Sequence, residues 1–251
     1  MRIVEPNWLA PARVRALTTT RTLDGASQAP FDAFNLGAHC GDDARAVAAN
    51  RASLRERFNL PAEPRWLRQV HGTTVAEFAA LTAAGAEPVE ADAAITRSPG
   101  VVLAVLTADC LPLLVCADDG SEIAAIHAGW RGLAAGIIEA AIERMQTPRA
   151  CLLAWLGPAI GPASYEVGAE VRDAFVTHDS AAAAAFAPTR AGHWHCDLYT
   201  LAQQRLDALG VARIHGGGFD TYGDSRFYSH RRSMSLQSGR TGRFASLIWI
   251  A

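Results

Sequence analysis

Residues 101–132 read VVLAVLTADCLPLLVCADDGSEIAAIHAGWRG, and this stretch decides the fold. The run 101–106 is too continuously apolar for a half-exposed strand, so it predicts a buried one. The apolar run resumes over residues 111–116, and Asp118-Asp119-Gly120 predicts a turn before a third strand at 122–126. Cys110 and His127 are therefore expected where buried strands are interrupted.

Gly129 and Gly132 open a predicted helix, whose apolar residues follow the 3.6-residue period as far as Met145. Arg131 stands at the entrance of this helix. Free backbone N–H groups and the positive end of the helix dipole make such an entrance a natural anion seat, and an arginine there would strengthen it.

Outside this stretch, strands and helices are mixed without strict alternation. Asp42 or Asp43 is expected to cap a helix that ends near Phe58, and Asp197 a second helix over 198–209. Expected strands are 66–70 and 73–78 with His71-Gly72 between them, and 152–156, 211–214 and 246–250; residues 79–90 and 180–185 are expected to be surface segments. This order favours a mixed or antiparallel α/β sandwich over a doubly wound parallel sheet.

The composition excludes several classes of protein. The 251 residues carry a net charge of −2 and contain no lysine, so no basic stripe is available for a nucleic-acid duplex. The five cysteines show no Cys-x-x-Cys spacing, which indicates a reducing compartment. No signal peptide or run of about 20 apolar residues is found, so we expect a cytoplasmic protein with no membrane partner. The oligomeric state is left open.

His71, Cys110 and His127 are the candidate reactive residues. A catalytic zinc ion usually has three protein ligands and one open position, and three candidates on separate segments suit that arrangement. Two other interpretations stay open at this point. Cys110 could be a nucleophile with His127 as its base in a metal-free hydrolase or deamidase, or the metal could be structural in a binding protein.

Other motifs carry less chemistry. His193-Trp194-His195 could bind copper, but the local sequence predicts a surface loop. A multicopper oxidase needs on the order of ten histidines, whereas this chain has eight, mostly dispersed. No Walker or G-x-G-x-x-G motif is present, and Gly216-Gly217-Gly218 is interpreted as a turn.

Taken together, the motifs resemble those of the YfiH or laccase-domain family, also called the multicopper polyphenol oxidase family, and the resemblance covers nearly the whole chain. Its strongest elements are Arg68-Gln69-Val70-His71-Gly72, Ala108-Asp109-Cys110, His127-Ala128-Gly129-Trp130-Arg131-Gly132, Gly157-Pro158-Ala159-Ile160-Gly161-Pro162, Tyr165-Glu166-Val167-Gly168 and Arg231-Arg232. Two short segments depart from the usual pattern. Asp220-Thr221 stands where the family has Cys-Thr, and Ala163-Ser164 where it has a cysteine pair.

The resemblance implies a single domain over residues 1–251, with a four-layer α/β/β/α sandwich of mixed sheets, similar to the deamidases related to cytotoxic necrotizing factor. It implies zinc held by His71, Cys110 and His127, which would then be the catalytic residues, while the family name leaves copper possible. Arg131, Arg51 and Arg231 are the expected substrate-binding arginines.

By the same resemblance, the expected function is phosphorolysis of adenosine, inosine, guanosine and 5′-methylthioadenosine, together with hydrolytic deamination of adenosine. The expected small-molecule partners are a purine nucleoside and phosphate. In deamination, a zinc-bound water of lowered pKa would attack C6 of adenosine and expel its amino group as ammonia. The alternatives are the metal-free Cys–His hydrolase or deamidase, a laccase-like polyphenol oxidoreductase, and an enzyme that edits a cell-wall precursor.

Overall fold

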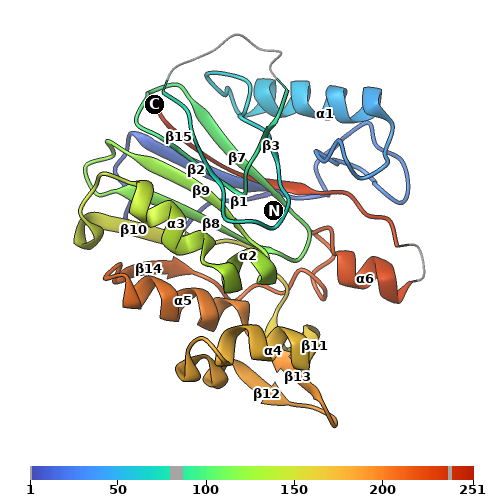
Figure 1. Cartoon of the computed structure of the whole chain (residues 1–251). Coiled ribbons are helices and arrows are strands. Elements are labelled where there is room, and N and C mark those ends of the chain that lie inside the picture. The colour runs from blue at the N-terminus through green and yellow to red at the C-terminus, as the bar shows by residue number, and fades with distance from the viewer. Residues whose placement is uncertain (1, 80–86, 237–238) are drawn as a thin grey trace.

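Two β-sheets lie face to face in the computed structural model, which describes residues 2–79, 87–236 and 239–251 (Figure 1). The first sheet is antiparallel, in the order β1 (Ile3–Val4), β2 (Val14–Thr19), β15 (Phe244–Ile250) and β7 (Val102–Thr107). The second has the order β14 (Arg213–Gly216), β10 (Leu152–Leu156), β8 (Leu111–Ala117), β9 (Ile123–Ala128), β6 (Ala93–Thr96) and β4 (Val75–Glu77). Its pairs β10–β14 and β4–β6 are parallel and the others antiparallel, so the sheet is mixed.

Both faces of the central strands are buried, which explains why their sequences are continuously apolar. In β7, Leu103 and Val105 belong to the cluster between the two sheets, whereas Val102, Ala104 and Leu106 pack on the opposite side with Leu54 of the first helix. Side chains of successive strand residues point to opposite faces, so a strand with both faces covered shows no polar alternation.

Helices cover the outer face of each sheet (Figure 1). Asp43 caps α1 (Ala44–Arg57) through the N–H groups of Arg45 and Ala46, and this helix lies on the first sheet. The second sheet is covered by α2 (Trp130–Ala135), α3 (Ile137–Arg144) and α5 (Leu198–Ala208). The expected four-layer α/β/β/α arrangement is confirmed. No helix in the described ranges is long and apolar enough to cross a bilayer.

The remaining elements are small. A three-stranded sheet of β11 (Glu166–Gly168), β13 (His193–Cys196) and β12 (Phe186–Pro188) lies with α4 (Ala169–Val176) at one end of the molecule (Figure 1). The strands β3 (Leu67–Arg68) and β5 (Val89–Glu90), which lie on either side of β4 in the sequence, form a parallel pair, and α6 (His230–Ser235) precedes β15. Short 3-10 helices occupy Arg149–Cys151, Pro162–Ser164 and Ser180–Ala185.

Three expectations about these elements were wrong. The helix predicted after Gly129 is two helices, because Gly136 adopts φ +98° and ends the first. His193–Cys196 is a strand rather than a loop. The connection expected at 79–90 ends in β5, and its residues 80–86 lie outside the described ranges.

Candidate metal centre and its cavity

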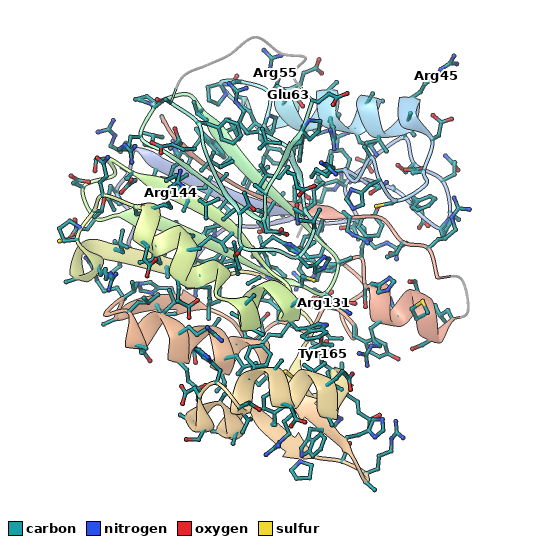
Figure 2. The ribbon with its side chains drawn as sticks, viewed as in Figure 1. Arg45, Arg55, Glu63, Arg131, Arg144 and Tyr165 are labelled. Carbon is teal, nitrogen blue, oxygen red and sulfur yellow. The ribbon has the colours of Figure 1, made fainter. Side chains whose placement is uncertain are left out.

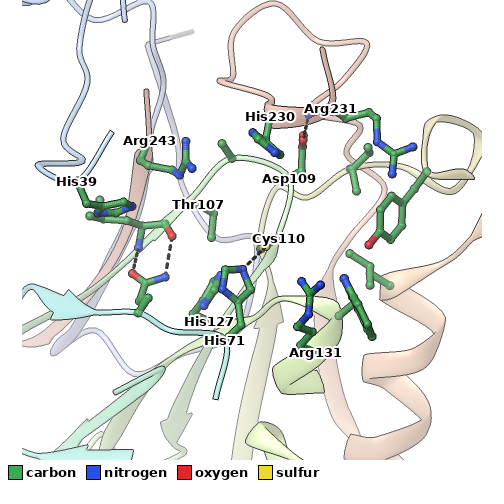
Figure 3. A pocket seen from close by; sticks show the side chains of 17 residues that line it. His39, His71, Thr107, Asp109, Cys110, His127, Arg131, His230, Arg231 and Arg243 are labelled. Atoms are coloured by element: carbon green, nitrogen blue, oxygen red, sulfur yellow. Dashed lines mark hydrogen bonds between the residues drawn. The ribbon is translucent and has the colours of Figure 1, made fainter. Parts of the chain in front are cut away.

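His71, Cys110 and His127 come together at one end of the second sheet (Figure 3). Their ligand atoms all lie within 4.8 Å of one another, and Cys110 Sγ is 3.7 Å from His71 Nε2. The two imidazole rings meet edge to face, with centroids 4.8 Å apart. Two imidazole nitrogens and a thiolate are donors that zinc favours, so the group could hold a metal ion.

The β8–β9 hairpin brings Cys110 to His127. Its antiparallel register places Leu111 opposite Ala128 and Pro112 opposite His127, so the residue before β8 lies beside the end of β9. Cys110 occupies the turn between β7 and β8, as expected. His127 is the penultimate residue of β9 and is buried, so the expectation that it interrupts a strand was wrong.

Asp92 organises both histidines, and the sequence interpretation missed it. Its fully buried carboxylate accepts the Nδ1–H of His127 at 2.8 Å, so Nε2 is the nitrogen of that ring that would bind a metal, after losing its proton. It also accepts the backbone N–H groups of Val70, His71 and Gly72 at 3.2, 2.9 and 2.7 Å. These bonds hold His71 at φ +62°, a conformation that is uncommon for a residue with a side chain.

The thiol of Cys110 and the imidazole of His127 form a charged pair even without a metal. Burial raises the pKa of the Cys110 thiol, but His127 and His71 outweigh this effect and lower the pKa to about 6. Burial lowers the pKa of His127, whereas Cys110 and Asp92 raise it, to about 9. Near neutral pH Cys110 is therefore a thiolate, which is both the metal-binding and the nucleophilic form of cysteine.

Two glycines allow α2 to approach this group closely. A Cβ on Gly129 would lie 2.6 Å from His71 Cδ2 and 3.0 Å from Cys110 Sγ. A Cβ on Gly132 would lie 2.9 Å from the carbonyl oxygen of Gly72. The pattern His-Ala-Gly-Trp-Arg-Gly thus reflects contact between the start of α2 and the ligand loops.

A cavity of about 390 Å³ opens beside the three ligands. Trp130, Tyr165, Ile160 and Leu198 give it apolar walls, and Arg131 and Arg231 reach it from α2 and α6. The Arg131 guanidinium lies 4.5 Å from the Trp130 ring centre, and that of Arg231 lies 5.1 Å from the Tyr165 ring centre. Figure 2 shows Arg131 and Tyr165 where α2 meets the small sheet, away from the outer-surface residues Arg45, Arg55 and Arg144.

The third predicted arginine is engaged elsewhere. Arg51 donates from Nε and Nη2 to the carbonyl oxygen of Leu36 at 3.0 and 2.8 Å, and stacks 4.2 Å from the Trp66 ring centre. It lines a separate hollow beside α1. Arg131 and Arg231 therefore line the cavity beside the three predicted metal ligands, whereas Arg51 does not.

The two positions that depart from the family pattern contact each other. Ser164 Oγ donates to Asp220 Oδ2 at 2.6 Å, and Gly161 N donates to Asp220 Oδ1 at 3.0 Å. The next residue, Thr221, donates from Oγ1 to Asp109 at 2.7 Å. The departures thus connect two loops behind the cavity, and neither Asp220 nor Ser164 lines it.

Asp109 supports the cavity rather than a metal ligand. Its φ is +89°, and its carboxylate accepts Thr221 Oγ1 and the backbone N–H of Arg231, each at 2.7 Å. Sequence reasoning did not single out several further lining residues, namely His39, Thr107, Trp130, Tyr165, His230 and Arg243. Trp130 stands in the same quoted motif as His127, which was the available signal, whereas the quoted motif of Tyr165 contains no predicted ligand.

Fold and site together define a four-layer α/β/β/α protein with a His–Cys–His group, spaced to hold a metal ion, at the end of a mixed sheet. Residues 15–251 match the family described as multi-copper polyphenol oxidoreductase laccase. The chain therefore belongs to this family, the laccase-domain or YfiH family.

Similar proteins match over nearly their full lengths. One from Pseudomonas aeruginosa, named purine nucleoside phosphorylase, is 54% identical over 247 residues, which are 98% of this chain and 97% of that protein. The Escherichia coli K12 protein named purine nucleoside phosphorylase YfiH is 46% identical over 250 residues, 99% of each chain. A crystal structure of a Neisseria meningitidis protein has a TM-score of 0.91 at 41% identity and covers 100% of this chain and 99% of its own.

Proposed function

We propose that this protein is a zinc-dependent purine nucleoside phosphorylase, with His71, Cys110 and His127 as metal ligands. The observation that carries the proposal is the position of these ligands, in the wall of a cavity that also presents two aromatic rings and arginines. The names of the relatives support the same reaction. Candidate substrates are adenosine, inosine, guanosine and 5′-methylthioadenosine.

The proposed reaction balances without a further reagent. An oxygen of hydrogen phosphate forms a bond to C1′ of the ribose as the bond from C1′ to the purine nitrogen breaks. The phosphate proton ends on the departing purine, and ribose 1-phosphate is the second product. A purine ring is flat and apolar on its faces, so the Trp130 and Tyr165 side of the cavity suits it.

The residues have separate tasks in this reaction. When bound, a zinc ion supplies a Lewis acid that polarises atoms of the substrate. Cys110 and the two histidines hold it, and Asp92 fixes the orientation of His127. Arg131 and Arg231 offer planar guanidinium groups that can pair with anionic oxygens. Ile160 and Leu198 add apolar surface to the cavity.

Hydrolytic deamination of adenosine, in which water replaces the C6 amino group and ammonia leaves, is proposed as the second activity, because a metal ion held by these three residues would also supply the activation of water. Polyphenol oxidation by several copper ions fits less well. In the described residues, His71, Cys110 and His127 are the one group of three or more donors that could hold a metal. A multicopper enzyme needs several such centres.

Product identification tests this function. Purified protein is incubated with adenosine, with and without phosphate, and the products are separated by liquid chromatography. We expect adenine and ribose 1-phosphate only when phosphate is present, and inosine in either case. The Cys110→Ala variant is expected to form neither adenine nor inosine. Absence of both products from the metal-loaded wild type would contradict the proposal and favour the cell-wall or oxidative alternatives.

A further inference from the structure

Thr107 presents a hydroxyl group that the protein itself does not satisfy. This residue ends β7, is 1% exposed and lines the cavity. Its Oγ1 is buried and has no hydrogen-bond partner among the described residues. A buried hydroxyl without a protein partner is costly and rare in folded proteins, so an oxygen of a bound molecule on this side of the cavity would stabilise it.

Arg243 and His39 lie on the same side of the cavity as Thr107. In the β7–β15 register Thr107 is opposite Phe244, the first residue of β15, and Arg243 immediately precedes that strand. The loop that carries His39 is attached to Arg243, since Leu36 N donates to its carbonyl oxygen at 3.0 Å. Figure 3 shows Thr107, His39 and Arg243 on one side of the three ligands and Arg131 on the other.

The charges around this side favour an anion. Arg243 keeps one guanidinium nitrogen on the carbonyl oxygens of Thr241 and Gly242, at 3.1 and 3.0 Å, while its side chain still lines the cavity. Burial lowers the pKa of His39, and the positive charges of Arg243 and Arg51 lower it further, as expected where the potential is positive. Asp109 is the one carboxylate among the described lining residues, and Thr221 and Arg231 already donate to it.

We propose that Thr107, His39 and Arg243 form the subsite for inorganic phosphate, on the side of the metal ligands opposite Trp130 and Tyr165. The assignment rests on the proposed phosphorylase function and locates its second substrate. A tetrahedral oxyanion presents several acceptors, so it can take the Thr107 hydroxyl, an imidazole N–H and a guanidinium N–H together. The purine then lies beside the aromatic rings, and the ribose spans the ligands between the two subsites.

Calorimetric titration of the zinc-loaded protein with inorganic phosphate, without nucleoside, tests the subsite. Thr107→Val keeps the shape of the side chain but removes the hydroxyl. We expect it to weaken phosphate binding by about 10-fold or more, the effect of losing a hydrogen bond to a charged group. Thr107→Ser retains the hydroxyl and should bind phosphate within about 3-fold of the wild type. Without phosphate, the valine variant should melt about 2–4 °C higher, because it no longer buries an unpaired hydroxyl.

Thr18→Val is the matched control, since the Thr18 hydroxyl is buried but shares a 2.7 Å hydrogen bond with Ser246. It should lower the melting temperature and leave phosphate affinity unchanged. His39→Gln is the second variant for the subsite, and should weaken phosphate binding several-fold whether or not the Thr107 variants fold. Wild-type phosphate affinity in both Thr107→Val and His39→Gln would overturn the assignment.

The subsite and the proposed function can fail separately. Suppose that the wild type binds phosphate, that Thr107→Val does not, and that no nucleoside is cleaved. This result would support the subsite and contradict the phosphorylase function. If the wild type releases adenine and Thr107→Val has an unchanged KM for phosphate, the function stands and the subsite falls.

Discussion

Asp92 connects the two histidines of the site through a single carboxylate. It accepts the ring N–H of His127 and the backbone N–H groups of residues 70–72. Burial raises the pKa of Asp92, but the hydrogen bonds from His127 and Gly72 outweigh it and hold the pKa below its usual value. Asp92 is thus a positioning residue, which fixes both the tautomer of His127 and the turn that carries His71.

We expect Asp92→Asn to weaken zinc binding by about 10–100-fold, the usual effect of altering a group that orients a metal-bound histidine. The asparagine amide nitrogen cannot accept an N–H group, so it loses half of the hydrogen bonds that the carboxylate receives. Competition with a chromophoric chelator measures the affinity. Wild-type affinity in this variant would contradict the role given to Asp92.

Glu122→Gln is the matched control for that variant. Glu122 is also a buried carboxylate that accepts backbone N–H groups, in this case those of Gln146 and Thr147, but it lies outside the metal-site cavity. Its replacement should lower stability and leave zinc affinity unchanged. A comparable loss of zinc in both variants would indicate a general effect of destabilisation.

At the scale of elements, α2 is a short helix between two glycines with different tasks. Gly129 precedes it with φ −67°, a backbone angle that any residue adopts, but its Cα faces His71 and Cys110. Gly136 ends it with φ +98°, where no close atom opposes a Cβ but the backbone conformation itself requires glycine. Gly129 therefore allows close packing at the metal site, and Gly136 allows the left-handed backbone conformation that ends α2.

These tasks predict opposite outcomes for two alanine substitutions. Gly129→Ala should push His71 and Cys110 apart and weaken zinc binding by about 10-fold or more, a loss comparable to that from disturbing the supports of a metal site. Gly136→Ala should cost about 1–2 kcal/mol of unfolding free energy, the penalty of a left-handed conformation, with zinc affinity unchanged. Chelator competition and chemical denaturation distinguish them. Wild-type zinc affinity in Gly129→Ala would contradict the role given to Gly129.

The sequence predicts elements well where local signals agree. Asp43 and Asp197 cap helices as expected, and the apolar runs of β7, β8 and β10 are buried strands. Asp92 could not be recognised, because it interrupts a short apolar run and its partners are 20 or more residues away. The β8–β9 hairpin was a usable signal for the proximity of Cys110 and His127. A turn at residues 118–120 places Cys110 beside the end of β9.

For the whole molecule, Glu122 joins distant parts of the chain. Its carboxylate accepts the side chain of Arg97 and the backbone of Gln146 and Thr147, so the start of β9 is held to the segment after β6 and the end of α3. Burial raises the pKa of Glu122, but these hydrogen bonds outweigh it and lower the pKa below the ordinary glutamate value.

This depressed pKa predicts a specific dependence of stability on pH. A carboxyl with a lower pKa in the folded state stabilises the fold above its unfolded pKa of about 4.3, and this contribution is lost as pH falls through the folded pKa. Urea unfolding from pH 7 to pH 3 should therefore show a smaller acid loss in Glu122→Gln than in the wild type. The variant should also be about 1–3 kcal/mol less stable at pH 7. An equal loss of unfolding free energy between pH 7 and pH 3 in the variant and the wild type would refute this role of Glu122.

The central claim is that one metal ion on His71, Cys110 and His127 supports the release of purine base in the adjacent cavity. Titration of zinc into chelator-treated protein, with the rate of adenine release from adenosine in phosphate as the readout, tests it most directly. The account predicts a rate that rises linearly and levels off at one zinc per chain, with no response in Cys110→Ser. Full activity of the metal-free wild type would contradict it and favour Cys110 as a nucleophile with His127 as its base.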